Sequence, residues 1–352
     1  MSTPVSGTAS ASAWQLGERA LVEKIRARFA SPEGALVVGI GDDAAVAEPV
    51  RGALEVLTTD ALVEGVHFDP AYSSYQDIGF KALAVNVSDI AAMGGTPRLA
   101  LLSLVLPERL TIADIDALLD GFAAMAAESR VTVAGGNLAR SPAGPPQSGP
   151  LVVDVTVIGS VRPRKILTRS AGRPGDALYL TGTIGAAAAG LDWLRMQPRH
   201  APREPQDPML AECVARHRRP GARTRIGSML GRSGTATTGM DLSDGLADAV
   251  TQVASQSGTG ATIDARALPI HPGAFEWFSS RGIDPVTAAL SGGDDYELLF
   301  GVPPKRRGKL RHVTQQSRGV PITRIGELTK DRAIVLNRDG RPEPLPPGFV
   351  HF

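Results

Sequence analysis

Residues 81–97, with the sequence KALAVNVSDIAAMGGTP, hold the pattern that most constrains the fold. They belong to a stretch, 78–93, that is apolar on almost every side and stops at Gly94-Gly95, so we expect a buried helix there. Asp89 lies inside this helix. A carboxylate on a buried helix is costly unless it is paired or binds a metal ion. Asp89 therefore either forms an ion pair, with Lys81 or another base, or ligates a cation.

Outward from this helix, short β-branched runs bounded by glycine or proline are interspersed with helical patterns. Thr111 and Asp114 predict a capping box at the start of an amphipathic helix. Expected helices lie at 20–29, 78–93, from 111 onward, 184–196 and 246–255, and expected strands at 34–40, 54–59, 99–106, 151–159, 177–181, near 262, 298–302 and 333–336. This pattern predicts an α/β (α+β) protein with mixed sheets.

The chain has 352 residues, enough for two domains. Two prolines and a glycine pair between 162 and 175 mark the expected boundary. We expect a disordered tail at 1–17, an N-terminal domain at 18–161 and a C-terminal α/β domain at 162–352. The segments 141–150 and 197–208 are expected to be loops of undefined role.

Composition excludes several classes of protein. The formal net charge is +1, so no global field favours nucleic acid or an anionic membrane. Cys213 is the only cysteine, which excludes a disulfide within the chain and a zinc site built from cysteines. The longest apolar run, 99–106, is too short to span a bilayer, and the first residues do not resemble a signal peptide. We therefore expect a cytoplasmic protein.

Acidic residues gather where a strand stops or a helix starts, beside glycine, serine or threonine. Such segments lie at 41–43, 58–60, 88–89, 241–245 and 292–295. Mg²⁺ prefers carboxylates, water and phosphate oxygens as ligands, so these segments are candidates for a magnesium site. The alternative is that Asp and Gly merely favour turns and caps. Capping explains Asp244, at a helix start, better than Asp241, in the preceding strand.

The common nucleotide-binding motifs are absent. The sequence has no G-x-x-x-x-G-K-[ST] and no protein-kinase motif set. Residues 39–44, GIGDDA, match G-x-G-x-x-A, but two carboxylates would then face a pyrophosphate and Pro49 follows where a helix should run. Carboxylates beside phosphates require a metal ion between them. The sequence therefore points to a Mg²⁺-nucleotide.

Seven blocks together resemble the thiamine-monophosphate kinase family in order and spacing, from about residue 18 to 352. They are GIGDDAAV (39–46), TTDALVEGVHF (58–68), KALAVNVSDIAAMGGTP (81–97), ILTRSAGRPGD (166–176), MDLSDGL (240–246), SGGDDYELLF (291–300) and GFVHF (348–352). This family belongs to the aminoimidazole ribonucleotide synthetase-like superfamily. The resemblance implies an N-terminal domain that binds ATP and Mg²⁺ and dimerises through its sheet, followed by a C-terminal α/β domain.

The resemblance also implies roles for single residues. Mg²⁺ coordination would fall to Asp43, Thr59, Asp60, Asp89, Asn137, Asp241 and Asp244, ATP binding to Asp43, Thr58, Gly136, Asn137, Arg169 and Ser243, and substrate binding to His67, Asp294 and Phe349. The residues implied in catalysis are Asp43, Asp60, Asp89, Asp244 and Arg169. One position departs from the family's GGD motif, which is Gly135-Gly136-Asn137 here. A neutral amide binds Mg²⁺ more weakly than a carboxylate, so the number of bound ions is open.

The resemblance implies direct, in-line transfer of the ATP γ-phosphoryl group to thiamine monophosphate, which gives thiamine diphosphate and ADP. The acceptor phosphate is already ionised near neutral pH, so catalysis reduces to positioning and charge neutralisation. Two alternatives stay open: another ATP-using enzyme of the superfamily, similar to aminoimidazole ribonucleotide synthetase, and an inactive nucleotide-binding module. The expected state is a homodimer, without nucleic-acid or membrane partners.

Overall fold

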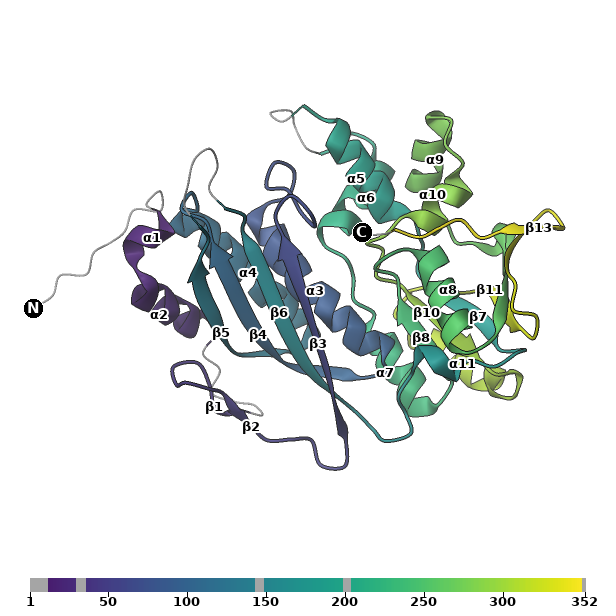
Figure 1. Cartoon of the computed structure of the whole chain (residues 1–352), viewed down its shortest axis with the longest axis horizontal. Coiled ribbons are helices and arrows are strands. Elements are labelled where there is room, and N and C mark those ends of the chain that lie inside the picture. The colour runs from purple at the N-terminus through teal and green to yellow at the C-terminus, as the bar shows by residue number, and fades with distance from the viewer. Residues whose placement is uncertain (1–11, 30–35, 143–148, 199–203, 350–352) are drawn as a thin grey trace, which may run out of the picture. The chain divides into compact units, whose positions relative to one another are not determined.

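The computed structural model describes residues 12–29, 36–142, 149–198 and 204–349. These residues form two compact units (Figure 1). The first unit takes the described residues of Met1–Arg51, Leu57–Asn86 and Pro97–Gly159, and the second takes those of Gly52–Val56, Val87–Thr96 and Ser160–Phe352. In contrast to the predicted domains, two short segments from the N-terminal half, 52–56 and 87–96, thus belong to the second unit.

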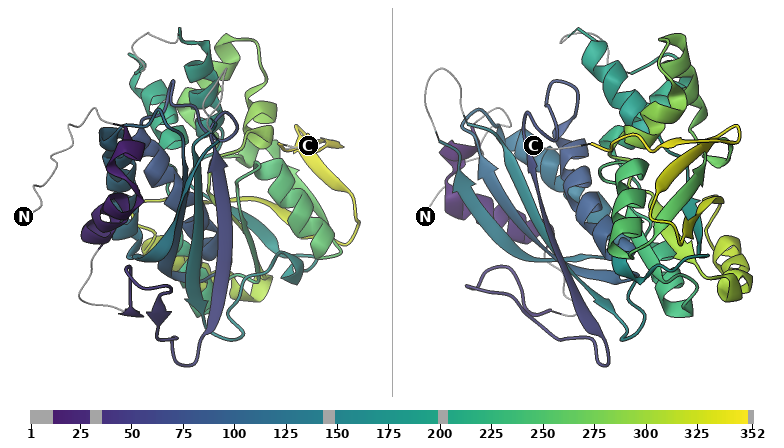
Figure 2. Two further views of the ribbon diagram at one scale, coloured as in Figure 1. Left: turned by 60° about the vertical axis from the view of Figure 1, so that its left-hand side comes forward. Right: turned by 45° about the vertical axis from the view of Figure 1, so that its right-hand side comes forward.

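A four-stranded sheet with the strand order β3-β6-β4-β5 forms the centre of the first unit. Its strands are β3 (Leu54–Val63), β4 (Thr96–Leu106), β5 (Thr132–Arg140) and β6 (Val152–Val161). Buried and half-buried residues alternate along β6, so one face of the sheet is covered and the other is open. The covered face carries helices α3 (Tyr75–Ala92) and α4 (Ile112–Ser129), as Figures 1 and 2 show.

Helices α3 and α4 touch through their backbones at two glycines. A Cβ atom on Gly79 would lie 1.9 Å from the carbonyl oxygen of Leu118, and a Cβ atom on Gly121 would lie 1.8 Å from that of Gln76. Neither position has room for any side chain. The close approach lets two nearly apolar helices bury their surfaces against each other.

The first unit also contains helices α1 (Ala13–Leu16) and α2 (Glu18–Phe29) and a ribbon in which β1 (Leu36–Val38) pairs antiparallel with β2 (Val46–Ala47). Within the segment 1–17, for which we predict a disordered tail, residues Ala13–Leu16 are helical in the structure. The indole N–H of Trp14 donates to the carbonyl oxygen of Leu106 over 3.0 Å, and the guanidinium of Arg140 lies 5.0 Å from the Trp14 ring centroid. These contacts anchor a segment whose composition indicated disorder. Residues 1–11 lie outside the described part of the chain.

A seven-stranded sheet with the order β13-β12-β9-β11-β7-β10-β8 forms the centre of the second unit. Its strands pair antiparallel except β12 with β9, which are parallel. The strands are β7 (Ala177–Thr181), β8 (Thr238–Asp241), β9 (Gly260–Asp264), β10 (Leu298–Val302), β11 (Ile322–Thr329), β12 (Ile334–Arg338) and β13 (Arg341–Pro344). In the first unit, β4 and β5 are also parallel. Both larger sheets therefore contain a parallel pair of strands. The predicted α/β fold class is confirmed.

Among the described residues of the second unit, seven α-helices accompany this sheet. They are α5 (Ala186–Met196), α6 (Pro208–Arg218), α7 (Thr224–Ser233), α8 (Leu246–Gln256), α9 (Pro272–Ser280), α10 (Pro285–Ser291) and α11 (Arg307–Gln315). Helix α8 buries Leu246, Val250 and Val253 in one apolar cluster with Leu180 and Met240 of the sheet. This packing fixes the start of α8 beside the end of β8.

The structure confirms the predicted elements whose sequences carry clear local patterns. The buried helix predicted at 78–93 is α3, strands predicted at 177–181 and 298–302 are β7 and β10, and the capping box forms between Thr111 and Asp114. Strand β5 was not predicted, since it contains Gly135-Gly136. None of the helices in the described ranges is long and apolar enough to cross a membrane.

Candidate active site

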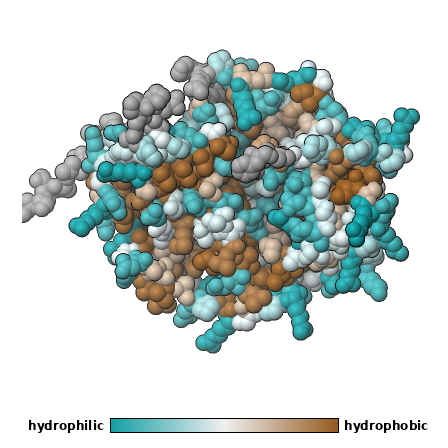
Figure 3. Space-filling model, in the orientation of Figure 1, coloured by the Kyte–Doolittle hydropathy of each residue, from teal (hydrophilic) through white to brown (hydrophobic). Residues whose placement is uncertain are grey.

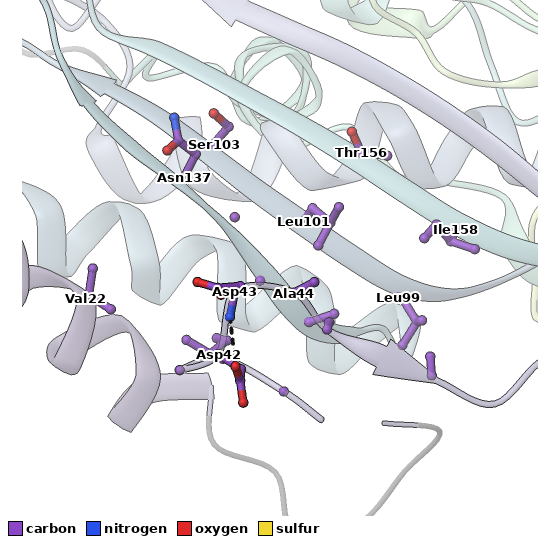
Figure 4. Close-up of a pocket in the computed structure, with 18 of the residues that line it drawn as sticks. Val22, Asp42, Asp43, Ala44, Leu99, Leu101, Ser103, Asn137, Thr156 and Ile158 are labelled. Carbon is purple, nitrogen blue, oxygen red and sulfur yellow. Dashed lines mark hydrogen bonds between the residues drawn. The ribbon is translucent and has the colours of Figure 1, made fainter. Parts of the chain in front are cut away.

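A cavity of about 850 Å³ lies in the first unit, lined by the open face of the four-stranded sheet, Val22 and the segment 39–47 (Figure 4). The segment 39–47 contributes the predicted residue Asp43, and β5 contributes Gly136 and Asn137. In Figure 4 the side chains of Asn137 and Ser103 lie next to each other, because these residues are register partners on β5 and β4. The cavity therefore joins two motifs that are separated in the sequence.

The glycine directly before Asn137, Gly136, is required by the sheet. A Cβ atom on Gly136 would lie 1.7 Å from the carbonyl oxygen of Leu102, its register partner on β4. The register shifts between Ala100 and Leu101, which marks a bulge just before this point. The absence of a side chain at Gly136 thus lets β5 approach the backbone of β4 closely, directly before the cavity residue Asn137.

The segment 39–47 presents two neighbouring carboxylates. Asp42 accepts a hydrogen bond from the backbone N–H of Asp43 over 3.1 Å, and both residues are exposed. Gly41, directly before them, has a backbone φ of 126°, a value that residues other than glycine rarely adopt. The turn thus orients Asp42 toward the backbone and leaves the carboxylate of Asp43 available at the cavity.

Strand β3 carries the predicted residues Thr58, Thr59 and Asp60. The Thr59 hydroxyl lies 3.1 Å from Oδ1 of Asp154 and 3.0 Å from Oγ1 of Thr156, both of which line the cavity. Side chains alternate along a strand, so Thr58 and Asp60 lie on the opposite face of β3 from Thr59. Of these three neighbours, only Thr59 is directed toward the cavity lining.

His67 follows β3 in a tight turn of the first unit. Its Nδ1 atom accepts a hydrogen bond from the backbone N–H of Val63 over 3.0 Å. This bond places the imidazole proton on Nε2, an assignment made from the bonding pattern. His67 is half-buried and does not line the cavity.

The second unit pairs Asp89 of α3 with Asp241 at the end of β8. The Ser88 hydroxyl donates to Oδ2 of Asp241 over 2.6 Å, and both residues are buried. Burial raises the pKa of Asp241 to about 7, and the neighbouring carboxylate of Asp89 contributes to the rise. The Ser88 hydrogen bond and the charge of Arg169 act in the opposite direction. Asp89 therefore lies beside a second carboxylate.

Arg169 is held at both its backbone and its side chain. Its carbonyl oxygen accepts hydrogen bonds from the hydroxyls of Ser257 (2.8 Å) and Thr238 (3.2 Å). Its guanidinium NH1 donates to Oε1 of Gln252 over 2.6 Å. Since its charge also acts on Asp241, Arg169 lies within electrostatic range of the carboxylate pair.

Backbone hydrogen bonds join the MDLSDGL and SGGDDYE motifs. The N–H of Asp294 donates to the carbonyl oxygen of Ser243 (2.8 Å), and that of Tyr296 donates to Leu242 (3.0 Å). Asp294 has a φ of 68° and Tyr296 a φ of 49°, conformations that are uncommon for these residue types. Backbone strain of this kind is frequent in functional loops.

Asp295 ties the same loop to helix α5. Its carboxylate accepts hydrogen bonds from the backbone N–H groups of Gly185 (2.8 Å) and Ala187 (3.3 Å) at the start of that helix. Burial raises the pKa of Asp295 to about 7, although these hydrogen bonds oppose the rise. Asp295 thus has backbone partners at the start of α5, and the equally half-buried Asp294 accepts a hydrogen bond from the hydroxyl of Tyr296 over 3.3 Å.

The C-terminal block returns to the start of α8. The backbone N–H of Phe349 donates to the carbonyl oxygen of Asp244 over 3.1 Å. A Cβ atom on Gly348 would lie 2.6 Å from Cβ of Asp248, so a glycine is needed for this approach. The Phe349 residue is 56% exposed and therefore presents an aromatic ring beside Asp244. Residues 350–352 of this block lie outside the described residues.

The predicted site residues thus fall into two groups. The first unit holds Asp43, Thr58, Thr59, Asp60, His67, Gly136 and Asn137, and the second holds Asp89, Arg169, Asp241, Ser243, Asp244, Asp294 and Phe349. In the part of the chain that the structure describes, no three His, Cys, Asp or Glu side chains converge as a complete metal centre. The half-buried Asp89, the buried Asp241 and the Ser88 hydroxyl are nevertheless a set of hard oxygen donors that suits Mg²⁺.

Sequence reasoning missed three contributors. Ser88 was noted only as the neighbour of Asp89, Asp295 only as the neighbour of Asp294, and Gln252 not at all. The spacing of Asp248 and Gln252 on α8 is the signal for Gln252, because residues four apart share a helix face.

Comparisons with known proteins identify the family to which the chain belongs. Residues 41–161 match the AIR synthase related protein, N-terminal domain, and residues 173–338 match the AIR synthase related protein, C-terminal domain. These matches confirm the two-domain fold family expected from the motifs. The thiamine-monophosphate kinase of Bacillus subtilis is 36% identical over 327 residues, which cover 90% of this chain and 93% of that protein.

Two solved structures are similar over nearly the whole chain. A thiamine-monophosphate kinase from Stenotrophomonas maltophilia aligns with a TM-score of 0.80 and 34% identity, over 93% of this chain and 98% of that one. AaThiL complexed with AMPPCP and TMP aligns with a TM-score of 0.74 and 31% identity, over 96% and 98%. With the motif residues in place and similarity across both units, the chain belongs to the thiamine-monophosphate kinase family.

Proposed function

We propose that the chain transfers the γ-phosphoryl group of ATP to thiamine monophosphate and releases thiamine diphosphate and ADP. Family membership supports this proposal, as does the similarity to a protein solved with AMPPCP, an ATP analogue, and TMP. The observation that carries it in this chain is the half-buried Asp89 beside the buried Asp241, with the charge of Arg169 in range. Such a site suits polyphosphate chemistry that requires a cation and a guanidinium.

Some of the proposed site residues would bind the two substrates, and others would neutralise the charge of the phosphates. Arg169 would bind the ATP phosphates, because a guanidinium matches phosphate oxygens in geometry and charge. Phe349 and Asp294 would hold the thiamine monophosphate, with His67 as a further substrate contact. An acceptor phosphate is ionised near neutral pH, so no side chain has to remove a proton. The residues act by placing the acceptor oxygen in line with the γ-phosphorus.

Mg²⁺ is proposed as the metal ion that the chain binds. The residues that would hold Mg²⁺ are Asp43, Thr59, Asp60 and Asn137 in the first unit, and Asp89, Asp241 and Asp244 in the second. When bound, Mg²⁺ supplies charge neutralisation for the crowded phosphate oxygens. Its fit rests on the donor set, since two close carboxylates repel each other unless a proton or cation lies between them.

We also propose a homodimer, and we place the reaction in the cytoplasm, where ATP is available. The open face of the four-stranded sheet carries half-buried apolar residues, Leu101, Val105, Val152 and Ile158. Figure 3 shows apolar side chains gathered over this sheet. A second copy would cover them, as is common for exposed apolar surfaces of this kind. Light scattering after size-exclusion chromatography should give twice the monomer mass.

The function is tested by following ADP and thiamine diphosphate with purified protein, ATP and Mg²⁺. We expect both products to form in equal amounts and only when thiamine monophosphate is present. Release of ADP without an acceptor would favour another ATP-using activity. Binding of AMPPCP without turnover of any acceptor would favour an inactive nucleotide-binding module.

A further inference from the structure

Arg169 donates to a neutral side chain rather than to a carboxylate. Its NH1 group bonds Oε1 of Gln252 over 2.6 Å, and the amide Nε2 of Gln252 donates to Oδ2 of Asp248 over 2.6 Å. Gln252 and Asp248 are one turn apart on α8 and are both half-buried, whereas Arg169 is exposed. The three residues therefore form a linear chain of hydrogen bonds that ends at an exposed cation.

The direction of this chain is fixed by chemistry. A guanidinium only donates and a carboxylate only accepts, so a residue between them must accept from one and donate to the other. A glutamine amide does both. Because Asp248 takes the amide N–H group, the amide oxygen of Gln252 must face Arg169. Asp248 thus selects the orientation of the glutamine, and the glutamine selects the position of the guanidinium.

Because the side chain of Gln252 carries no charge, it affects how Arg169 can bind an anion. A carboxylate at position 252 would also hold Arg169, but it would compensate the guanidinium charge and compete with any anion for it. A neutral acceptor uses one N–H group and leaves the rest of the guanidinium and its whole charge available. The charge of Arg169 indeed acts on the buried Asp241. Position 252 thus orients Arg169 without neutralising it.

We infer that Gln252 and Asp248 are positioning residues that hold Arg169 ready for the phosphates of ATP. This inference rests on the proposed function for the identity of the anion. The backbone of Arg169 is fixed separately by Ser257 and Thr238, so loss of Gln252 frees only the side chain. Neither Gln252 nor Asp248 touches the reacting groups in this account.

The test compares variants of similar shape. Gln252→Met keeps the length of the side chain and removes both hydrogen bonds, whereas Gln252→Glu keeps an acceptor and adds a charge. Gln256→Met, an exposed position on the same helix, is the matched control. Asp248→Asn is the conservative variant, because an amide oxygen still accepts the bond from Gln252. Asp248→Ala removes that acceptor.

Both KM for ATP and Kd for AMPPCP are measured, the latter by calorimetry without thiamine monophosphate. We expect Gln252→Met to weaken both by about 10- to 100-fold, the scale of one hydrogen bond to a charged group. KM for thiamine monophosphate and the melting temperature should not change. Gln252→Glu should be impaired at least as strongly as Gln252→Met. Asp248→Ala should resemble Gln252→Met, and Asp248→Asn should stay within about threefold of the original chain.

The measurements distinguish the different ways in which the inference or the proposed function could be wrong. Normal Kd and KM values in Gln252→Met, beside an active original chain, would overturn the positioning role. Normal values in Gln252→Glu would overturn the requirement for a neutral acceptor. If the original chain binds AMPPCP but does not phosphorylate thiamine monophosphate, the proposed function fails, and the binding data alone decide the positioning role. No AMPPCP binding by the original chain would overturn both.

Discussion

At the level of single residues, Cys213, His271 and Glu212 are arranged in the order of a nucleophilic triad. The sulfur of Cys213 lies 3.4 Å from Nδ1 of His271, and Nε2 of His271 lies 3.4 Å from the Glu212 carboxylate. The N–H of Gly273 also donates to Nδ1, which leaves no lone pair to deprotonate the thiol. Burial raises the pKa of Cys213 to about 12 and lowers that of His271, so both are neutral at pH 7. The arrangement is structural.

Cys213 is therefore expected to be inert in the folded protein. A thiol-specific chromogenic reagent at pH 8 should modify no cysteine in the native chain and one cysteine after denaturation. Cys213→Ala should keep its phosphotransferase activity, since the proposed transfer is direct and passes through no enzyme-bound phosphate. Rapid labelling of the native chain would show that the thiol is accessible and would reopen a covalent mechanism.

The raised pKa of Asp295 predicts that the unfolding free energy of the chain depends on pH. Its folded pKa of about 7 lies above the usual value of 3.8. A raised pKa gives stability that is fully present below pH 3.8 and is lost as the pH rises toward 7, because the unfolded chain ionises first. Asp295→Asn should flatten the fall in unfolding free energy over this range, by at most about 1.4 kcal/mol per pH unit. An unchanged slope, measured in chelator by denaturant titration, would contradict the raised pKa.

The position of Asn137 leads to a prediction about how activity depends on the Mg²⁺ concentration. It lines the cavity beside Ser103, in the position of an aspartate in the family motif. Asn137→Asp adds a charge to a hard-ion site, so we expect half-maximal activity at a lower Mg²⁺ concentration. Ser103→Ala serves as a cavity variant without a change of charge. If the Mg²⁺ titration of Asn137→Asp matches that of the original chain, position 137 is not a ligand.

At the level of elements, the packing of α3 against α4 depends on a backbone contact at two glycines. Gly79→Ala or Gly121→Ala would place a methyl group under 2 Å from a carbonyl oxygen, so α3 and α4 must separate. We expect each variant to lose at least about 3 kcal/mol of unfolding free energy. Gly308→Ala in α11 is the control, since nothing lies within 4 Å of its added methyl group. That variant should be neutral or gain up to about 1 kcal/mol.

The elements also show what the sequence could and could not predict. The apolar run of α3, the capping box of α4 and the short strands β7 and β10 carry local patterns, and all were found. Strand β5 was missed because its glycines are explained only by the Leu102 carbonyl of its neighbour, a contact distant in sequence. Helix α1 was missed because Trp14 is held by Leu106 and Arg140, which no local pattern reveals.

At the level of the whole molecule, the acidic motifs are shared between the two units. Motif recognition could group them by family, but spacing alone could not show that Asp241 lies beside Asp89 or that Thr59 contacts Asp154 and Thr156 of β6. Those relations depend on strand register and on contacts across more than a hundred residues, which the sequence does not encode locally.

Activity is therefore expected to require carboxylates from both units. Asp43→Asn and Asp60→Asn in the first unit, and Asp89→Asn and Asp244→Asn in the second, should each lower kcat by at least about 100-fold, the scale of lost transition-state stabilisation. Circular dichroism should show that these variants stay folded. Asp331→Asn, an exposed position in the second unit, is the control. Near-normal activity in any two of the four would remove them from the site.

The contact between α3 and α4 also constrains how the chain can evolve. The partners of Gly79 and Gly121 are the backbone carbonyls of Leu118 and Gln76, which every amino acid possesses. No replacement at 118 or 76 can therefore make room for a larger residue at 79 or 121, and compensatory substitution is blocked. Among relatives that keep this helix pair, the two glycines should be invariant yet show no covariation with the residues they touch. Contact prediction from correlated substitutions would overlook one of the tightest contacts in the fold.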